Sequence, residues 1–181
     1  MNFELLSLSW AKAATLKTDA LVVLVGDDQQ REVGLLSSML DQAQKTGDFT
    51  TAAGQCMVWW KPPSLAALRL VLVGVGKGRA IDVRQGVAAG MAALKKSKSQ
   101  TVAVVLQAGH TEHLVVAAQA AADASYVYTA TKPSAKALSF KKITLGVPQA
   151  GAVKGQFDLA KAQMAGVALA REWGNRPANH A

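Results

Sequence analysis

The chain has 181 residues, of which 50% are hydrophobic and 18% are charged, so it is long enough for one domain with a buried core and too apolar to be disordered. It has no run of uncharged apolar residues long enough to span a membrane, and its first ten residues lack the features of a secretory signal. Its single cysteine, Cys56, excludes an internal disulfide and is predicted to be a buried, unreactive thiol. These features predict a cytoplasmic protein.

Apolar runs that are typical of buried strands recur along the chain, at 21–25, 55–60, 68–75, 101–106 and 140–147, and an alternating run at 2–9 is typical of a half-buried strand. Helical patterns lie between them, at 29–45, 82–97, 111–125 and 155–173. This order predicts an α/β fold with a mixed, largely parallel sheet flanked by helices on both faces.

Two further local predictions concern connections. Seven residues separate the strands at 55–60 and 68–75, too few for a helical crossover, so these strands are predicted to pair antiparallel. The segment 129–139 is predicted to be a surface loop.

A glycine-rich turn follows the strand at 68–75. The segment VGVGKGRAID at 73–82 could hold a phosphate on its backbone amides, with help from Lys77 and Arg79, and its glycines are Gly74, Gly76 and Gly78. The spacing matches neither GxGxxG nor GxxxxGK[ST], so a structural turn is favoured over a nucleotide site. The helix after the turn is predicted to begin with a capping box formed by Asp82 and Gln85.

The acids and histidines show no catalytic pattern. His110 and His113 are three residues apart, but HTEH matches neither HExxH nor HxxEH, and the remaining histidine is His180. Thr111 is predicted to cap a helix there, with both imidazoles of the HTEH segment exposed. The adjacent acids Asp27 and Asp28 are predicted to form a helix-capping turn. No catalytic, cofactor-binding or metal-binding residue is therefore assigned in this chain.

Positive charge is concentrated in the middle of the chain. Residues 49–157 hold 13 lysines and arginines against three acids, whereas residues 1–48 hold seven acids against four bases. A solvated surface is the favoured interpretation, and a surface that binds nucleic acid is the alternative. The positions that would test binding to DNA are Lys95, Lys96, Lys98, Lys132 and Lys136.

The last predicted helix has two apolar stripes on opposite sides. The first stripe consists of Phe157, Ala160, Met164, Val167 and Ala168. The second stripe consists of Leu159, Ala162, Gly166, Leu169 and Trp173. Because a surface helix needs one stripe, we expect the second stripe to be exposed or covered by another chain or domain.

The segment ALAREWGNRPANHA at 168–181 resembles the junction between the two domains of the cytosolic leucine aminopeptidase family, which includes leucyl aminopeptidase and bacterial aminopeptidase A. Asn175, Pro177 and Asn179 match its Asn-x-Pro-x-Asn element. The segments 68–94 and 131–145 resemble the glycine turn with its helix, and the basic loop with its last strand, of that family's N-terminal domain.

This resemblance implies that residues 1–173 form a macro-domain-like N-terminal domain ending in an interdomain helix. It also implies that residues 174–181 begin the linker to a C-terminal catalytic domain, which would cover the second stripe. The intact protein would be a hexameric metallopeptidase with two zinc or manganese ions, releasing N-terminal amino acids from peptides, and this domain would contribute to assembly or partner binding.

The resemblance carries no catalytic residue over to this chain. The metal-binding motifs of the family resemble Lys-Gly-x-x-Phe-Asp-Thr-Gly-Gly and Asn-Thr-Asp-Ala-Glu-Gly-Arg, and neither occurs here. The chain alone is therefore expected to be inactive and to hold no metal tightly. The alternatives are a DNA-binding module and a macro-like domain that binds ADP-ribose at 74–79, for which Asp19 is the candidate ribose-binding acid.

Overall fold

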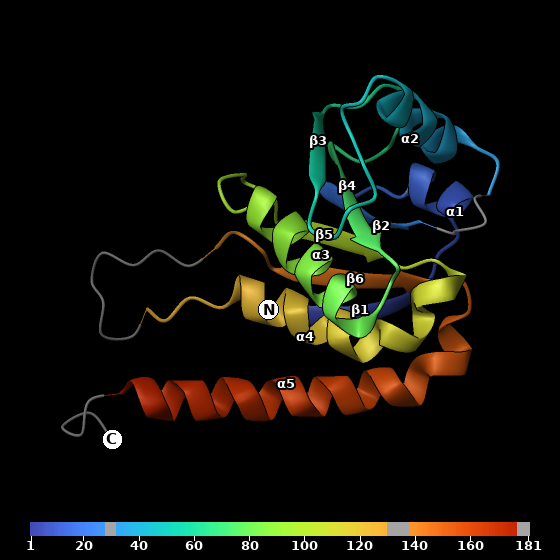
Figure 1. Ribbon diagram of the computed structural model, residues 1–181. Coiled ribbons are helices and arrows are strands. Elements are labelled where there is room, and N and C mark those ends of the chain that lie inside the picture. Colours follow the sequence, from blue (N-terminus) through green and yellow to red (C-terminus); the bar gives the residue numbers. More distant parts are fainter. Residues whose placement is uncertain (28–31, 130–137, 177–181) are drawn as a thin grey trace.

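The computed structural model describes residues 1–27, 32–129 and 138–176, so most of the predicted loop at 129–139 lies outside the described residues (Figure 1). A six-stranded sheet forms the centre in the order β1-β6-β5-β2-β4-β3. The strands are β1 (Asn2–Ser7), β2 (Ala20–Gly26), β3 (Cys56–Trp60), β4 (Arg69–Gly76), β5 (Thr101–Val105) and β6 (Lys142–Val147).

All neighbouring strands run parallel except β3, which pairs antiparallel with β4. The short connection between β3 and β4 reverses the chain through Lys61 and Ser64, which both have positive φ, and the Lys61 N–H donates to the Leu68 carbonyl at 2.8 Å. The predicted mixed, largely parallel sheet and its antiparallel pair are therefore confirmed.

Helices cover both faces of the sheet, as predicted (Figure 1). One face packs against α1 (Trp10–Thr15) and α2 (Leu35–Lys45). The other face packs against α3 (Ala80–Ala93), α4 (Leu114–Ser125) and the start of α5 (Lys154–Asn175). Two short 3₁₀ helices, η1 (Ala108–His113) and η2 (Ala150–Val153), precede α4 and α5.

Strand β2 shows why the sequence produces a two-sided core. Its residues are all buried, and successive side chains point to opposite faces of the sheet. Leu21 and Val23 pack on the side of α1 and α2, whereas Val22 and Leu24 pack on the side of α3 and α4. A continuous apolar run therefore becomes a central strand covered on both faces.

The structure corrects three predicted helix starts. Helix α3 begins at Ala80, with Arg79 rather than Asp82 as the capping residue. The Asp82 carboxylate, one turn into the helix, accepts hydrogen bonds from the Arg79 N–H at 3.3 Å and from the Arg79 guanidinium at 2.8 Å. Gln85 instead donates to the Ala53 carbonyl. Thr111 lies inside η1 rather than at a cap, and α2 begins at Leu35, later than predicted.

Helix α1 was not predicted, because six residues are too few to show helical periodicity. Its start is capped by Ser9, whose hydroxyl accepts the Lys12 N–H at 3.3 Å. Helix α5 extends to Asn175, two residues beyond the predicted end at 173. Within the described ranges, no helix has the length and apolar content needed to cross a membrane.

Candidate functional site

Helix α5 packs against the rest of the molecule mainly through its first third. Phe157 and Ala160 are buried, Met164 is half-buried, and Val167 and Ala168 are exposed. The first stripe is therefore covered only in part, because α5 lies beside β1 and α4 at the edge of the molecule rather than across the sheet (Figure 1).

The second stripe of α5 is exposed along its whole length. Leu159, Leu169 and Trp173 are 57%, 61% and 60% exposed, and the small residues between them, Ala162 and Gly166, are exposed as well. The predicted exposure of this stripe is confirmed. This row of large apolar side chains is a candidate interaction surface, because removing such side chains from water is favourable.

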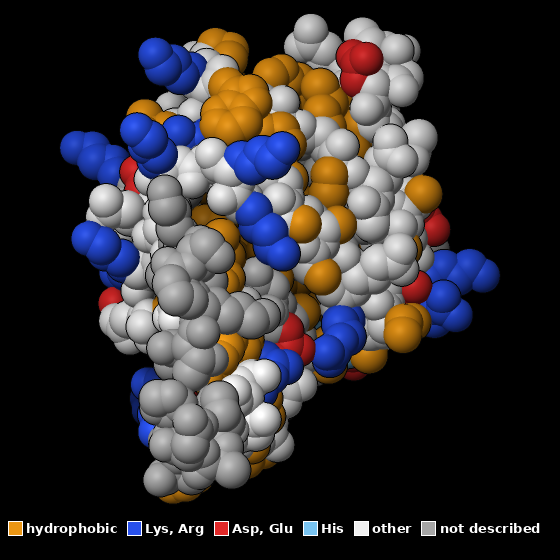
Figure 2. Space-filling model, turned by 90° about the vertical axis from the view of Figure 1, so that its left-hand side faces the viewer, with side chains coloured by type: hydrophobic (Ala, Val, Ile, Leu, Met, Phe, Trp, Pro, Cys, Tyr) orange, Lys and Arg blue, Asp and Glu red, His pale blue; other side chains and the backbone are white. Residues whose placement is uncertain are grey.

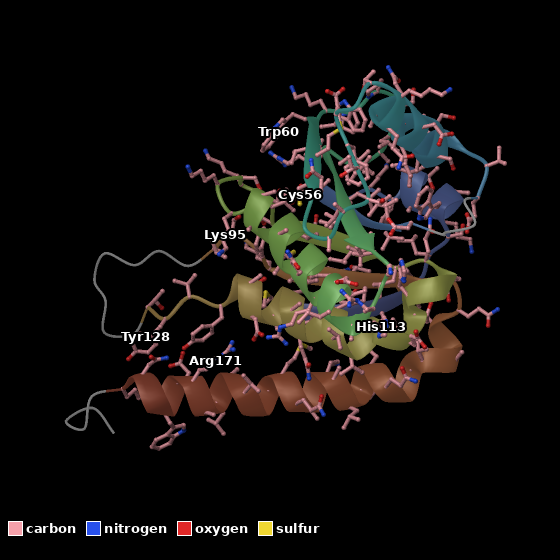
Figure 3. The ribbon with its side chains drawn as sticks, viewed as in Figure 1. Cys56, Trp60, Lys95, His113, Tyr128 and Arg171 are labelled. Atoms are coloured by element: carbon pink, nitrogen blue, oxygen red, sulfur yellow. The ribbon has the colours of Figure 1, made fainter. Side chains whose placement is uncertain are left out.

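The end of α5 is tied to α4 through Asp123. This carboxylate accepts hydrogen bonds from Arg84 of α3 at 2.8 Å and from Arg171 of α5 at 2.7 Å. The Arg171 guanidinium also lies 5.3 Å from the centre of the Tyr126 ring. Figure 3 shows Arg171 on the side of α5 that faces the rest of the molecule, so this cluster sets the direction of the exposed stripe.

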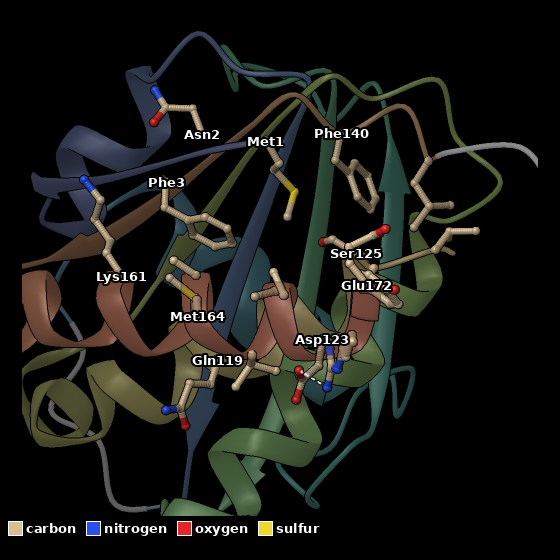
Figure 4. Close-up of a pocket in the computed structure, with 18 of the residues that line it drawn as sticks. Met1, Asn2, Phe3, Gln119, Asp123, Ser125, Phe140, Lys161, Met164 and Glu172 are labelled. Atoms are coloured by element: carbon tan, nitrogen blue, oxygen red, sulfur yellow. Dashed lines mark hydrogen bonds and ion pairs between the residues drawn. The ribbon is translucent and has the colours of Figure 1, made fainter. Parts of the chain in front are cut away.

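A pocket of about 830 Å³ lies between α5 and the sheet edge. Its lining comes from β1, α3, α4, the segment before β6 and residues 161–172 of α5 (Figure 4). The helix therefore spans a hollow between its packed start and its tethered end.

The glycine turn after β4 is a structural turn. Gly76 and Gly78 have φ values of 49° and 70°, which favour glycine. The Gly76 N–H donates to the Thr51 carbonyl and the Gly78 N–H to the Val75 carbonyl, both at 2.7 Å. These amides are thus engaged within the chain, which supports the structural interpretation over a phosphate site.

His110 is buried against this turn, so its predicted exposure is wrong. Only 6% of His110 is exposed, and a Cβ added to Gly78 would lie 2.1 Å from its ring. The imidazole thereby fills the space between the turns that follow β2 and β4. The side chain of His113 is 20% exposed, and its Nε2 lies 3.4 Å from a Glu112 oxygen. Among the described residues, no three His, Cys, Asp or Glu side chains gather closely enough to hold a metal ion.

The stability of the chain is expected to fall at mildly acidic pH because of His110. Burial lowers the pKa of its imidazole. In the unfolded chain the imidazole takes up a proton near pH 6.5. The contribution of neutral His110 to the free energy of unfolding is therefore complete above about pH 6.5 and is lost as the pH falls toward the pKa of the folded state. Urea unfolding between about pH 7.5 and pH 5.5 should show the loss, and H110Q should remove most of it. If the loss of stability at acidic pH is unchanged in H110Q but removed in H113Q, it does not come from His110.

Asp19 is not placed to bind a ribose at the glycine turn. Its carboxylate accepts the N–H groups of Gln100 and Thr101 at 2.7 and 3.0 Å. Partial burial raises the pKa of Asp19, but these hydrogen bonds outweigh it and hold the pKa below its ordinary value. Asp19 precedes β2, whereas the glycine turn follows β4, which runs parallel to β2, so the two lie at opposite ends of the sheet.

Comparison with known proteins identifies the fold and its family. The model of the cytosol aminopeptidase family, N-terminal domain, matches residues 22–135. The chain belongs to this family. A probable cytosol aminopeptidase of Acidovorax sp. (strain JS42) is 44% identical and one of Verminephrobacter eiseniae (strain EF01-2) is 42% identical, each over 100% of this chain. The chain spans only 37% and 35% of the length of these two relatives.

Solved structures show the same fold. A tomato leucine aminopeptidase mutant matches 99% of this chain and 39% of its own, with a TM-score of 0.73 and 20% sequence identity. The bottromycin maturation enzyme BotP matches 90% of this chain and 34% of its own, with a TM-score of 0.60 and 23% identity. These structures share the fold of this chain, with its mostly parallel six-stranded sheet.

This family domain also carries a basic surface beside its edge strand β3. Trp60 is 58% exposed, and the Arg69 guanidinium lies 5.0 Å from its ring centre and donates to the Ser99 hydroxyl. Figure 2 shows basic side chains gathered around exposed hydrophobic ones on this side, and Figure 3 places Trp60 and Lys95 on it. Exposed lysines flank these residues in sequence: Lys61 follows Trp60, and Lys95, Lys96 and Lys98 precede Ser99. Lys132 and Lys136 lie outside the described residues.

Two of the remaining candidates, Cys56 and Asp27, lie among the described residues. Cys56 is half-buried rather than buried, and burial raises the pKa of its thiol, which disfavours the reactive thiolate. Asp27 accepts a hydrogen bond from the Thr51 hydroxyl. The other candidates from the sequence lie outside the described residues: Asp28, Pro177, Asn179 and His180.

Proposed function

We propose that this chain is the non-catalytic N-terminal domain of a leucyl aminopeptidase and that α5 docks on a C-terminal catalytic domain. The observation that carries the proposal is the exposed second stripe of α5, which presents Leu159, Leu169 and Trp173 to solvent. The relatives support it, since the chain spans little more than a third of their length. Docking would remove these side chains from water.

The proposed whole protein releases N-terminal amino acids from peptides in the cytoplasm, in keeping with the names of the relatives, which are probable cytosol aminopeptidases. Two divalent metal ions, zinc or manganese, would supply the Lewis acid and the activated water. The described residues of this chain offer no set of ligands that fits such ions. We therefore place the ions in the catalytic domain. We also propose that the N-terminal domain takes part in a hexameric assembly, with α5 held in its orientation by the Asp123 cluster.

This proposal predicts a separation of activity between two proteins. The extended protein, meaning this chain continued through the proposed catalytic domain, is expected to hydrolyse leucine anilides with manganese or zinc and to lose this activity to a chelator. Residues 1–181 alone are expected to show no turnover and no tight zinc or manganese binding by calorimetry, because two-metal hydrolysis needs several converging carboxylates. Tight metal binding by residues 1–181 would overturn the placement of the ions, and an inactive extended protein would overturn the activity.

A second candidate function is DNA binding by the basic surface around Trp60. The exposed indole beside Arg69 and the nearby lysines combine an aromatic face with positive charge. Each neutralised phosphate releases counterions, so affinity for duplex DNA should fall steeply as salt rises from about 50 mM. The ADP-ribose alternative gains no comparable support, because His110 and the engaged amides close the turn.

Charge reversal tests the DNA interface. K95E/K96E is expected to weaken binding and to lower the slope of log affinity against log salt by about 0.9 for each phosphate that is no longer neutralised. K12E/K45E changes the same charge at exposed positions of α1 and α2 and is expected to have little effect. Fluorescence anisotropy with a labelled duplex measures both. No binding at about 50 mM salt, or equal losses of affinity in the two variants, would remove this candidate.

A further inference from the structure

The pocket beneath α5 has the size of a ligand site and is open to solvent on one side. Its volume of about 830 Å³ falls within the range of about 300–1,000 Å³ that is typical of small-molecule pockets. Helix α5 forms one wall because it is held at both ends, by buried Phe157 at its start and by Arg171 near its end. Met164 lines the hollow while it packs on the edge of the core, and Val167 and Ala168 line the hollow and are exposed.

One part of the pocket lining is apolar. Phe3 of β1 and Phe140, which precedes β6, lie on the sheet side, and Met164 of α5 lies opposite them (Figure 4). Such a wall favours a ligand with apolar side chains, because a small hydrated anion would leave it in contact with water.

The other part of the pocket carries an excess of positive charge. Arg84 and Arg171 both line it and share the single carboxylate of Asp123 (Figure 4 marks an ion pair of Asp123). A guanidinium has five N–H donors, and one donor of each is used in these two ion pairs. The lining also holds Lys161 and Glu172, whose charges offset each other. A second carboxylate, brought by a ligand, would balance the remaining charge at the arginine pair.

We propose that this pocket binds a short apolar peptide by its C-terminal carboxylate. Arg84 and Arg171 hold the carboxylate, and the apolar side chains lie against Phe3, Phe140 and Met164. A purely apolar molecule would desolvate the guanidinium groups without replacing their water, and a polyanion would not cover the apolar wall. The choice of a peptide as the apolar carboxylate rests on the proposed function, because a peptidase works where such peptides are present.

The pocket connects ligand binding to the docking helix. The same helix that lines the pocket on one side carries Leu169 and Trp173 on the exposed second stripe. A peptide that fills the hollow would add contacts to the middle of α5, where packing is otherwise thin. Binding is therefore expected to raise the thermal midpoint of residues 1–181 as the peptide concentration increases.

Titration calorimetry on residues 1–181 tests the proposal with N-acetyl-leucyl-leucine as the probe. The acetyl group removes the free amino terminus that an aminopeptidase needs, so the result is independent of whether the extended protein is active. The free acid is expected to bind. Its C-terminal amide is expected to bind at least about tenfold more weakly, which corresponds to the loss of one charge-assisted hydrogen bond. N-acetyl-glycyl-glycine, which keeps the carboxylate but lacks apolar side chains, is also expected to bind more weakly.

Two variants place the binding in this pocket. R171Q is expected to weaken binding of the acid at least about tenfold, whereas R176Q, at an exposed arginine that does not line the pocket, is expected to leave it unchanged. A168W fills the pocket from an exposed helical position and should block binding without loss of folding, as checked by circular dichroism. Equal affinity for acid and amide, no binding at millimolar peptide, or undiminished binding by A168W would each overturn the proposal.

Discussion

In the extended protein, W173A is expected to lower the free energy of unfolding by about 3 kcal/mol, the usual cost of removing a buried tryptophan. The same change in residues 1–181 is expected to shift the free energy by less than about 0.5 kcal/mol, because the side chain is already in water there. Trp173 is 60% exposed in this chain. The difference between the two proteins therefore measures how far docking buries this residue, and urea unfolding of both gives it directly.

Trp60 supplies the matched control. It is 58% exposed, close to the exposure of Trp173, but it lies on β3 beside Arg69 rather than on α5. W60A is expected to change the two proteins alike, by the modest loss of its interaction with the guanidinium. If W173A also changes both proteins alike, the second stripe is not the docking surface.

G74A is expected to destabilise residues 1–181 by about 3 kcal/mol, at the upper end of the cost of overpacking. A Cβ at Gly74 would lie 2.3 Å from the Ala52 carbonyl oxygen and 2.6 Å from Thr51 backbone atoms. The Gly74 N–H and carbonyl also bond to Gln55 and Gly54, at 2.9 and 3.0 Å. The clash falls on backbone that is held in place, so no rotation of a side chain can relieve it.

Gly166 provides the contrast for this substitution. A Cβ there meets no atom within 4 Å, and the residue lies in the exposed part of α5. G166A is expected to leave stability unchanged or to raise it by up to about 1 kcal/mol, because alanine favours a helix over glycine. Thermal denaturation of G74A and G166A in residues 1–181 measures both effects. If G74A is as stable as the unsubstituted chain, segment 51–55 does not pack on β4 as described.

The sequence contained most of the information on the architecture of this domain. Unbroken apolar runs such as 21–25 require burial on both faces, which already implies a parallel sheet between helices. The seven-residue link before β4 determined the antiparallel pair, because no crossover helix fits into it. The spacing of Leu159, Leu169 and Trp173 likewise determined a second apolar stripe on α5, since helical period alone assigns side chains to faces.

What only the tertiary structure decided concerns contacts between distant segments. Periodicity does not reveal that His110 fills the space above Gly78, or that the Asp19 carboxylate binds the start of β5, because these contacts depend on how strands are ordered across the sheet. The pocket arises in the same way, because its lining brings together residues of β1, α4 and α5, and Asp123 of α4 binds Arg171 of α5. Local sequence sets the faces of helices and strands, whereas strand order and helix placement set which faces meet.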